Sequence, residues 1–223
     1  MIVDSTNQVG DAKRNFCIKD MTRASSRPFI LGLGGTMRER SSTECALRVS
    51  LDAASGAGAE ILLLSGRDIA VPHYDPELPI ESPECSRLID ALARCDGLII
   101  ASPAYHGTVS GLVKNAIDYT DQLRRRGRNY LDGVAIGLIV CSGGWQAGGQ
   151  TLATMRAIAH ALRGWPTPLG SVLNTSVPNF DEDGACLEPK LQAQLETIGN
   201  QVVQFAHMRM QWKVTQSEIS MGK

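Results

Sequence analysis

Short hydroxyl side chains and an arginine follow the first long apolar run of the sequence. Residues 29–34 are apolar, and Gly34-Gly35 leads into "TMRERSST". Glycines let backbone approach a ligand, while hydroxyls, a guanidinium and the first amides of a following helix donate hydrogen bonds to an anion. An ordinary capped helix with two solvated arginines explains the same residues. If the segment binds a phosphate, the donors are Thr36, Arg38, Ser41 and Thr43.

This segment lacks two common phosphate-binding patterns. Counted from Gly32, the third glycine of G-x-G-x-x-G falls on Met37, and no G-K-[ST] follows. Any anion bound here is therefore held by a different loop from those of dinucleotide-binding or P-loop proteins.

A second candidate segment, "SPAYHGTVSG", covers residues 102–111. We expect Pro103 to end the preceding strand, because proline cannot continue a strand ladder, and Gly107 to allow an unusual backbone angle. Tyr105 and His106 would then project where a ligand lies. The alternative is a solvent-exposed loop whose tyrosine packs on the sheet edge.

A third segment, "CSGGWQAGG", covers residues 141–149 and has four glycines in nine positions. We expect a loop whose bare backbone amides suit a planar polar heterocycle, although the same composition suits simple flexibility. Trp145 could flank a ring or lie exposed. Ser142 is not in a nucleophile elbow, because Val140 stands where G-x-S-x-G needs a glycine.

Alternating apolar runs and helical periodicity surround these three segments. Helices separate the strands, so the sheet should be parallel, with strands covered on both faces. We predict a three-layer, flavodoxin-like, doubly wound sheet of five parallel strands in the order 2-1-3-4-5, which binds ligands beyond the carboxyl ends of strands 1 and 3. The strands are expected at 29–34, 59–65, 97–102, 133–142 and 168–174, and the helices at 43–54 (N-cap Ser42), 84–95, 111–123, 150–163 and 188–206.

The composition is that of a globular protein with no pronounced charge. The 223 residues are 43% hydrophobic and 20% charged, with a net charge of -1, which argues against a nucleic-acid or membrane surface. Six scattered cysteines without a C-x-x-C pair argue against a metal knuckle and favour free thiols in the cytoplasm. No apolar run approaches the length of a membrane span, and the N-terminus lacks the apolar core of a signal peptide. We expect a weakly ordered extension at 1–27, one domain at 28–206 and a tail at 207–223.

Two of these segments resemble motifs of the NADPH-dependent FMN reductase family, and the similarity runs from about Phe29 to Phe205. "GGTMRERSST" resembles its G-S-x-R-x-x-S phosphate loop, and "SPAYHGTVSGLVKNAIDY" resembles its P-E-Y-[NH]-G-S-x-x-G-x-[LV]-K-N-A-[IL]-D segment. "SGGWQAGG" stands at its Ser-Gly-Gly-rich loop. The resemblance implies that Thr36, Arg38, Ser41 and Thr43 hold the FMN phosphate, that Pro103, Ala104, Tyr105, His106 and Gly107 lie along the isoalloxazine, and that Ser142, Gly143 and Gly144 lie near its other edge.

Two departures from the family motifs stand out. Thr36 replaces a serine and keeps the hydroxyl, whereas Ala104 replaces a common glutamate, so a role of that carboxylate in orienting the cofactor or a partner subunit is in doubt. The polar residues Lys114, Asn115 and Asp118 we interpret as structural, because apolar neighbours at helical spacing bury the other face. The basic run at 123–128 is better explained as a solvated helix end than as a site for the 2′-phosphate of NADPH.

The resemblance implies an FMN-dependent NAD(P)H oxidoreductase, with NADPH or NADH as co-substrate and no catalytic side chain. A small-molecule acceptor such as free flavin or a quinone would receive the electrons in a ping-pong cycle. It also implies a homodimer or homotetramer. Two alternatives remain: a flavodoxin-type electron carrier, against which the net charge of -1 counts, and a scaffold or sensor that has lost the flavin.

Overall fold

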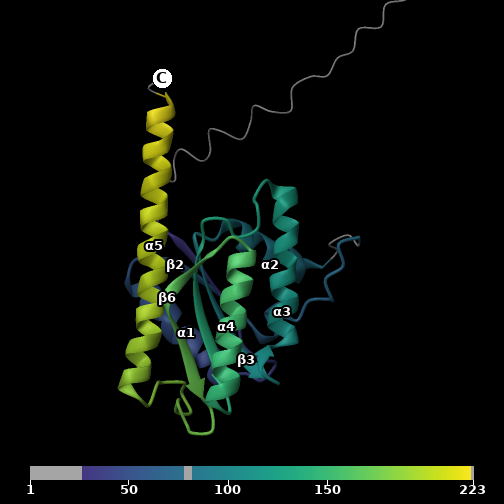
Figure 1. Cartoon of the computed structure of the whole chain (residues 1–223), viewed down its shortest axis with the longest axis vertical. Helices are drawn as coiled ribbons and strands as arrows, with labels where there is room; N and C mark the ends of the chain where they lie inside the picture. The colour runs from purple at the N-terminus through teal and green to yellow at the C-terminus, as the bar shows by residue number, and fades with distance from the viewer. Residues whose placement is uncertain (1–26, 78–81, 222–223) are drawn as a thin grey trace, which may run out of the picture.

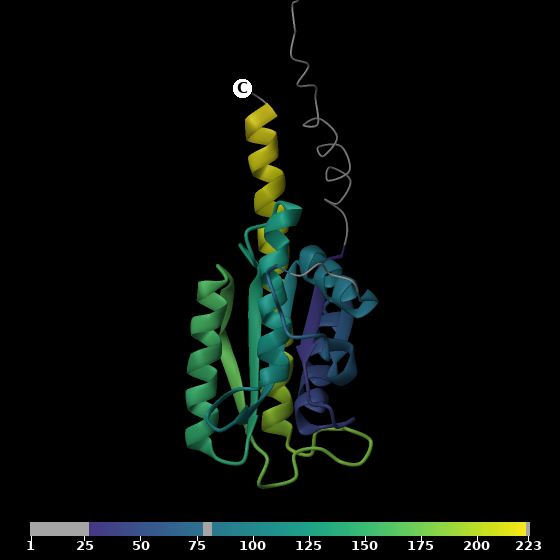
Figure 2. The ribbon, with the colours of Figure 1, turned by 90° about the vertical axis from the view of Figure 1, so that its right-hand side faces the viewer.

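A parallel sheet between two layers of helices forms the body of this protein (Figure 1, Figure 2). The computed structural model describes residues 27–77 and 82–221. The five parallel strands lie in the order β2-β1-β3-β5-β6, which confirms the predicted doubly wound topology. Their bounds are β1 (Phe29–Gly34), β2 (Glu60–Ser65), β3 (Gly97–Tyr105), β5 (Ala135–Ser142) and β6 (Trp165–Asn174), and a short β4 (Thr108–Val109) pairs antiparallel with the end of β3.

Helices cover both faces of the sheet. Helices α1 and α5 pack on one face, and α2, α3 and α4 pack on the other. The α-helices are α1 (Ser42–Gly56), α2 (Pro83–Arg94), α3 (Gly111–Asp118), α4 (Trp145–Ala161) and α5 (Pro189–Met221), and the 3-10 helices are η2 (Gly66–Ile69) and η3 (Tyr119–Arg126).

Alternation along the strands explains why both layers form. Leu31 and Leu33 of β1 enter the core beneath α2, α3 and α4, whereas Ile30 enters the core beneath α1 and α5. Successive strand residues point to opposite faces, so a nearly continuous apolar run supplies both cores at once. This double burial holds the carboxyl ends of the strands in place, and the candidate segments follow those ends.

The prediction that Pro103 ends its strand is wrong. Strand β3 continues to Tyr105, and Pro103 pairs with Cys141 of β5. On its other side, the pairing of β3 with β1 stops at Ala101, opposite Gly34. Beyond that point β3 has a parallel neighbour on one side only, where a missing N–H is tolerated as it is in an edge strand.

Helices α3 and α5 end far from their predicted C-terminal ends. Helix α3 ends at Asp118 and gives way to η3, rather than running to residue 123. Helix α5 continues to Met221, through most of the segment expected to be a tail. The expected N-terminal extension falls almost wholly at residues 1–26, outside the described residues. No helix within 27–77 and 82–221 is long and apolar enough to cross a membrane.

Candidate functional site

The chain leaves β1 through Gly34 and Gly35, two positions that other residues would not fit. A Cβ at Gly34 would lie 2.0 Å from the carbonyl oxygen of Ala101 on the neighbouring strand. Gly35 has φ +92° and donates its N–H to the same oxygen at 3.2 Å. These contacts turn the chain across the end of β3 and place the segment 35–41 at the junction between β1 and β3.

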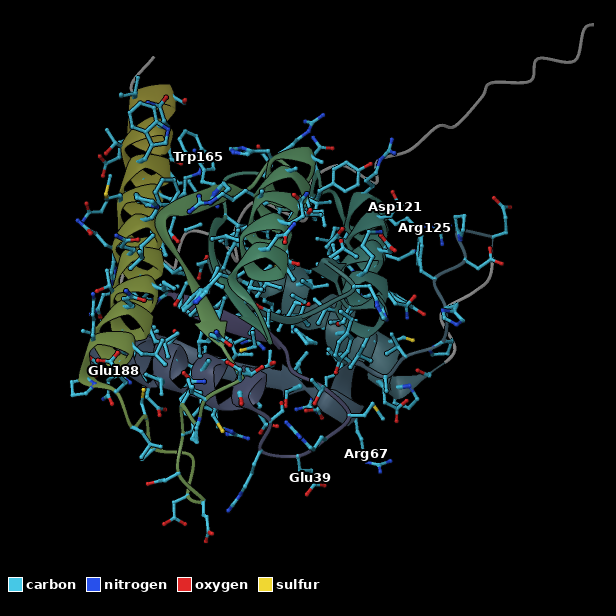
Figure 3. The ribbon with its side chains drawn as sticks, turned by 60° about the horizontal axis from the view of Figure 1, so that its bottom comes forward. Glu39, Arg67, Asp121, Arg125, Trp165 and Glu188 are labelled. Carbon is cyan, nitrogen blue, oxygen red and sulfur yellow. The ribbon has the colours of Figure 1, made fainter. Side chains whose placement is uncertain are left out.

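The four predicted donors after β1 differ in what they can offer a ligand. Thr36 is half-buried; its hydroxyl accepts from the N–H of Arg38 and donates to the Arg38 carbonyl, both at 3.2 Å. The Arg38 side chain is exposed and has no hydrogen-bond or ion-pair partner among the described residues. Figure 3 looks toward this end of the sheet, where the neighbouring Glu39 points away from the body.

Ser41 and Thr43 have hydroxyls that the fold already uses. Ser41 is the N-cap of α1, and its Oγ accepts from the N–H of Glu44 at 3.3 Å, so the prediction of Ser42 as N-cap is wrong. The pattern Ser41-Ser42-Thr43-Glu44 is a capping-box sequence and could have identified the true cap. Ser41 and Thr43 are only 1% and 2% exposed.

Thr43 faces a buried thiol at the end of β5. Burial raises the pKa of Cys141 to about 12, and a hydrogen bond with the Thr43 side chain partly opposes that increase. The first turn of α1 still offers donors, because the N–H groups of residues 42 and 43 have no acceptor within the helix. The amides of residues 42 and 43 are thus available to an anion even though the Ser41 and Thr43 hydroxyls are engaged.

Two residues that the sequence reasoning missed shape this loop. Arg40, with φ +51°, donates from its guanidinium to the carbonyl of Glu182 at 3.0 Å and ties the loop after β6 to the loop after β1. Glu44 is 8% exposed and forms an ion pair with Arg48 at 2.6 Å. Arg48 thus compensates a carboxylate that would otherwise repel an anion at the N-terminus of α1.

The segment after β3 is a tight hairpin. Ala104 pairs with Val109 and Tyr105 with Thr108, so His106 and Gly107 form a two-residue turn. Both have positive φ, +52° and +82°, as a type I′ turn requires. Tyr105 and His106 are exposed, Tyr105 by 56%, and Ala104 and Gly107 are half-buried.

The hairpin is anchored from below by a buried serine. The hydroxyl of Ser102 accepts from the N–H of Ser110 at 3.0 Å and donates to the carbonyl of Pro103 at 2.9 Å. Ser110 in turn caps α3, since its Oγ accepts from the N–H of Val113 at 3.3 Å. The position of Tyr105 is therefore set by strand, turn and helix cap together.

The glycine-rich segment after β5 is shorter than predicted. Only Gly143 and Gly144 lie between β5 and α4, because α4 begins at Trp145 rather than at residue 150. Gly144 is the N-cap and provides no side-chain hydrogen bond, while the Ser142 hydroxyl donates to the Gly144 carbonyl at 2.7 Å. The first amides of α4 consequently have no side-chain cap and remain donors for a ligand.

These three segments meet at one edge of the sheet. Strand β3 lies between β1 and β5, and Pro103 is level with Cys141, so the hairpin stands beside Gly143 and Gly144. A Cβ built at Gly107, Gly143 or Gly144 meets no atom within 4 Å, which leaves open space along this edge. Met37, Tyr105 and Trp145 expose 52%, 56% and 66% of their surfaces around it.

This arrangement fits a molecule with an anionic tail and a flat ring. The guanidinium of Arg38 and the amides that begin α1 suit a phosphate. Exposed aromatic side chains and unobstructed glycine amides suit a planar heterocycle with hydrogen-bonding edges. Among the described residues, no group of three or more His, Cys, Asp or Glu side chains could hold a metal ion. The residues predicted to bind FMN therefore lie along one edge of the sheet.

Two other polar groups singled out in the sequence have structural contacts. Asn115 accepts from the N–H of Tyr74 at 2.9 Å and donates to the carbonyls of Val71 and Pro72. Lys114 and Asp118 form an exposed ion pair at 2.6 Å. The structural interpretation of these three residues is thus supported, since Asn115 holds the long loop after β2 against α3.

The basic run after α3 also contacts the protein itself. Arg128 donates to the carbonyls of Leu92, Ala93 and Cys95 at the C-terminal end of α2, and Arg126 pairs with Asp90. Arg125 donates to the carbonyl of Pro76 at 3.2 Å. Figure 3 shows Arg125 and Asp121 on the α3 side of the molecule, to one side of Glu39. These contacts account for Arg125, Arg126 and Arg128 without a bound nucleotide.

Comparisons with known proteins identify the family of the chain. The family model for NADPH-dependent FMN reductase matches residues 28–177. The FMN-dependent NADPH-azoreductase of Staphylococcus aureus is 30% identical over 114 residues, which cover 50% of this chain and 57% of the relative. The matched region is thus little more than half the length of that relative.

Solved structures share the fold at low identity. FerB, a flavoenzyme NAD(P)H:(acceptor) oxidoreductase from Paracoccus denitrificans, superposes with a TM-score of 0.68 at 21% identity and covers 82% of this chain and 98% of its own. RosB, solved with bound 8-demethyl-8-formylriboflavin-5′-phosphate, has a TM-score of 0.68 at 13% identity and covers 88% of each chain.

Proposed function

The chain belongs to the NADPH-dependent FMN reductase family, and from that premise we propose that it is an FMN-dependent NAD(P)H oxidoreductase. One observation supports the proposal most strongly. The loop after β1, with an arginine and free amides, lies beside the hairpin after β3, with its exposed tyrosine, where the order of the strands reverses. In doubly wound sheets ligands bind at that point. The azoreductase relative, whose name states FMN and NADPH, supports the same cofactor and co-substrate.

In this proposal the chain positions the cofactor and performs no acid–base chemistry of its own. The phosphate is held by the Arg38 guanidinium, by the Thr36 side chain and by the backbone amides of Ser41 to Thr43, where α1 begins. Pro103 to Gly107 line one side of the ring, and the backbone at Ser142 to Gly144 lines its other edge. Bound FMN would supply the redox chemistry, accepting hydride from NAD(P)H and passing electrons to a second acceptor.

The acceptor in this proposal is a small planar molecule, such as a quinone or free flavin, which could stack on the exposed aromatic side chains at this edge. Tyr105 and Trp145 stand open to solvent there. A ping-pong cycle follows if the nicotinamide and the acceptor use this same opening in turn. The protein is proposed to be homo-oligomeric and cytoplasmic. The five cysteines in the described residues are free thiols, which suits a reducing compartment.

A flavodoxin-type electron carrier is the second candidate, because carriers share this fold. The net charge of -1 disfavours it, since carriers of that kind are usually strongly acidic. Mixing the FMN-loaded protein with NADPH without oxygen distinguishes the two. In an oxidoreductase, the absorbance of the oxidised flavin disappears after NADPH is added and returns when a quinone is added. A protein that binds FMN but stays oxidised in excess NADPH and NADH would refute the proposed activity.

A further inference from the structure

The last part of α5 carries an apolar stripe that nothing in the described residues covers. Among residues 207–220 of α5, whose burial the structure describes, none is buried. Met208, Trp212 and Ile219 expose 57%, 57% and 52% of their surfaces. Figure 1 and Figure 2 both show this part of the helix extending alone past the body, at the end opposite the loops of the candidate site. An exposed stripe of this size on a solitary helix is unusual unless it meets a partner.

The spacing of the stripe is that of a helix-pairing seam. Phe205, Met208, Trp212, Thr215 and Ile219 follow one another at intervals of three, four, three and four residues. This is the a/d spacing of a coiled coil, narrower than the stripe of a helix that packs on a globular core. The seam also continues onto the body, because the Trp165 ring on edge strand β6 lies 5.4 Å from that of Phe205 and is itself 59% exposed.

We propose that this seam, residues 205–219 of α5 together with Trp165, binds the same seam of a second copy of the chain. A two-fold axis makes such a contact self-complementary, because one surface serves both partners. In the antiparallel arrangement Met208 of one copy lies level with Ile219 of the other, and Trp212 lies level with Thr215. The tip of each helix then covers the region of Trp165 and Phe205 on its partner.

Charge distribution favours this antiparallel pairing. The seam residues are all uncharged, and the flanking charges are Arg209 and Lys213 toward the body and Glu218 toward the tip. Antiparallel helices bring Glu218 of one copy level with Arg209 of the other, whereas parallel helices align like charges. Two cations and one anion in residues 207–221 also make a lipid surface a poor partner, because interfacial helices are rich in lysine and arginine.

The exposed apolar area of the seam supplies most of what a specific contact needs. Large aromatic side chains bury roughly 150 to 250 Å² each. On that scale, the exposed portions of Trp165, Met208, Trp212 and Ile219 on two copies offer on the order of 900 Å² of apolar surface. Flanking polar side chains add to this, and specific interfaces begin near about 1,200 Å² in total.

Sedimentation velocity over a dilution series tests the proposal on the full chain. Trp212→Lys, and independently Ile219→Lys, place a charge in the seam at exposed positions that the body does not use. The matched control is Ser217→Lys, which adds the same charge to an exposed residue of the same helix outside the seam. Circular dichroism checks that helix content is retained in each variant.

The expected result is an assembled wild type and control, with both seam variants reduced to half that mass or less. Three outcomes would overturn the proposal: a wild type that is monomeric throughout, seam variants with the wild-type mass, or a control that dissociates as they do. In a monomeric wild type, loss of a shielded component of the tryptophan emission on Trp212→Phe would show that another part of the same chain covers the seam. Flavin binding is read separately, so failure here leaves the proposed activity untouched.

Discussion

Among the residues after β1, Arg38 is the arginine whose side chain is available to an anionic ligand, because Arg40 bonds to Glu182. The Arg38 guanidinium is exposed and makes no hydrogen bond or ion pair in the described part of the chain, whereas the Ser41 hydroxyl caps α1. The Thr43 hydroxyl faces Cys141. Phosphate binding at this site would therefore depend mainly on the Arg38 guanidinium and on backbone amides. The hydroxyls of Ser41 and Thr43 would contribute little.

We expect Arg38→Ala to weaken FMN binding by about 10- to 150-fold, because a charge-assisted hydrogen bond contributes roughly 1.5 to 3 kcal/mol. Titration of the variant with FMN, followed by flavin fluorescence, measures the change. Arg124→Ala is the matched control, since that arginine is exposed and lies near Tyr130, away from the loop after β1. Equal FMN affinity in Arg38→Ala and wild type would mean that the phosphate binds elsewhere.

The buried thiol behind the site should make stability depend on alkaline pH. Burial raises the pKa of Cys141 from 9.0 to about 12, so above pH 9 the unfolded chain releases a proton that the folded chain keeps. Stability then falls as pH rises from 9 toward 12, by up to about 1.4 kcal/mol per pH unit for this thiol. Urea unfolding of Cys141→Ala should show a shallower decline above pH 9 than wild type. Identical slopes would contradict the assignment.

At the scale of elements, α3 supports the site from outside rather than taking part in it. Its Asn115 makes three hydrogen bonds to the backbone of residues 71–74. We expect Asn115→Ala to lower the free energy of unfolding by about 2 to 3 kcal/mol, because it removes the part-buried hydrogen bonds of the Tyr74 N–H and the Val71 carbonyl, whereas the Pro72 carbonyl still accepts from the Tyr119 hydroxyl.

The matched control for that prediction is Lys114→Ala on the same helix. It removes an exposed ion pair with Asp118, which contributes at most about 1 kcal/mol. Urea unfolding measures both variants. A loss of stability in Asn115→Ala no larger than in Lys114→Ala would show that Asn115 does not hold the loop.

The sequence predicts where the strands lie, but it does not predict where strand β3 ends or where helix α4 begins, near the site. Apolar runs such as residues 29–34 determine strands through burial on both faces, and β1 has those bounds. Local propensity misled at Pro103 and at the glycines after Ser142. Pro103 is accommodated because β1 ends before it, and α4 begins within "WQAGG" because Gly148 packs against β6, where a Cβ would lie 2.3 Å from Val172. Both effects come from tertiary contacts, which a local sequence pattern does not show.

The molecule as a whole explains why separate loops form one site. The strand order reverses between β1 and β3, so segments more than 60 residues apart in sequence end side by side. Periodicity predicts this topology, because parallel strands require helical crossovers. It does not predict the tie between Arg40 and the loop after β6, or the length of α5, since both depend on contacts that leave no periodic signal.

The central claim is that the loop after β1 and the start of α1 bind the phosphate of FMN. Comparison of FMN with riboflavin, which has the same ring and no phosphate, tests it most directly by titration of the purified wild-type protein. We predict that FMN binds at least about tenfold more tightly, because only FMN meets the guanidinium and the helix amides. Equal affinities for the two flavins, or no binding of either, would contradict the account.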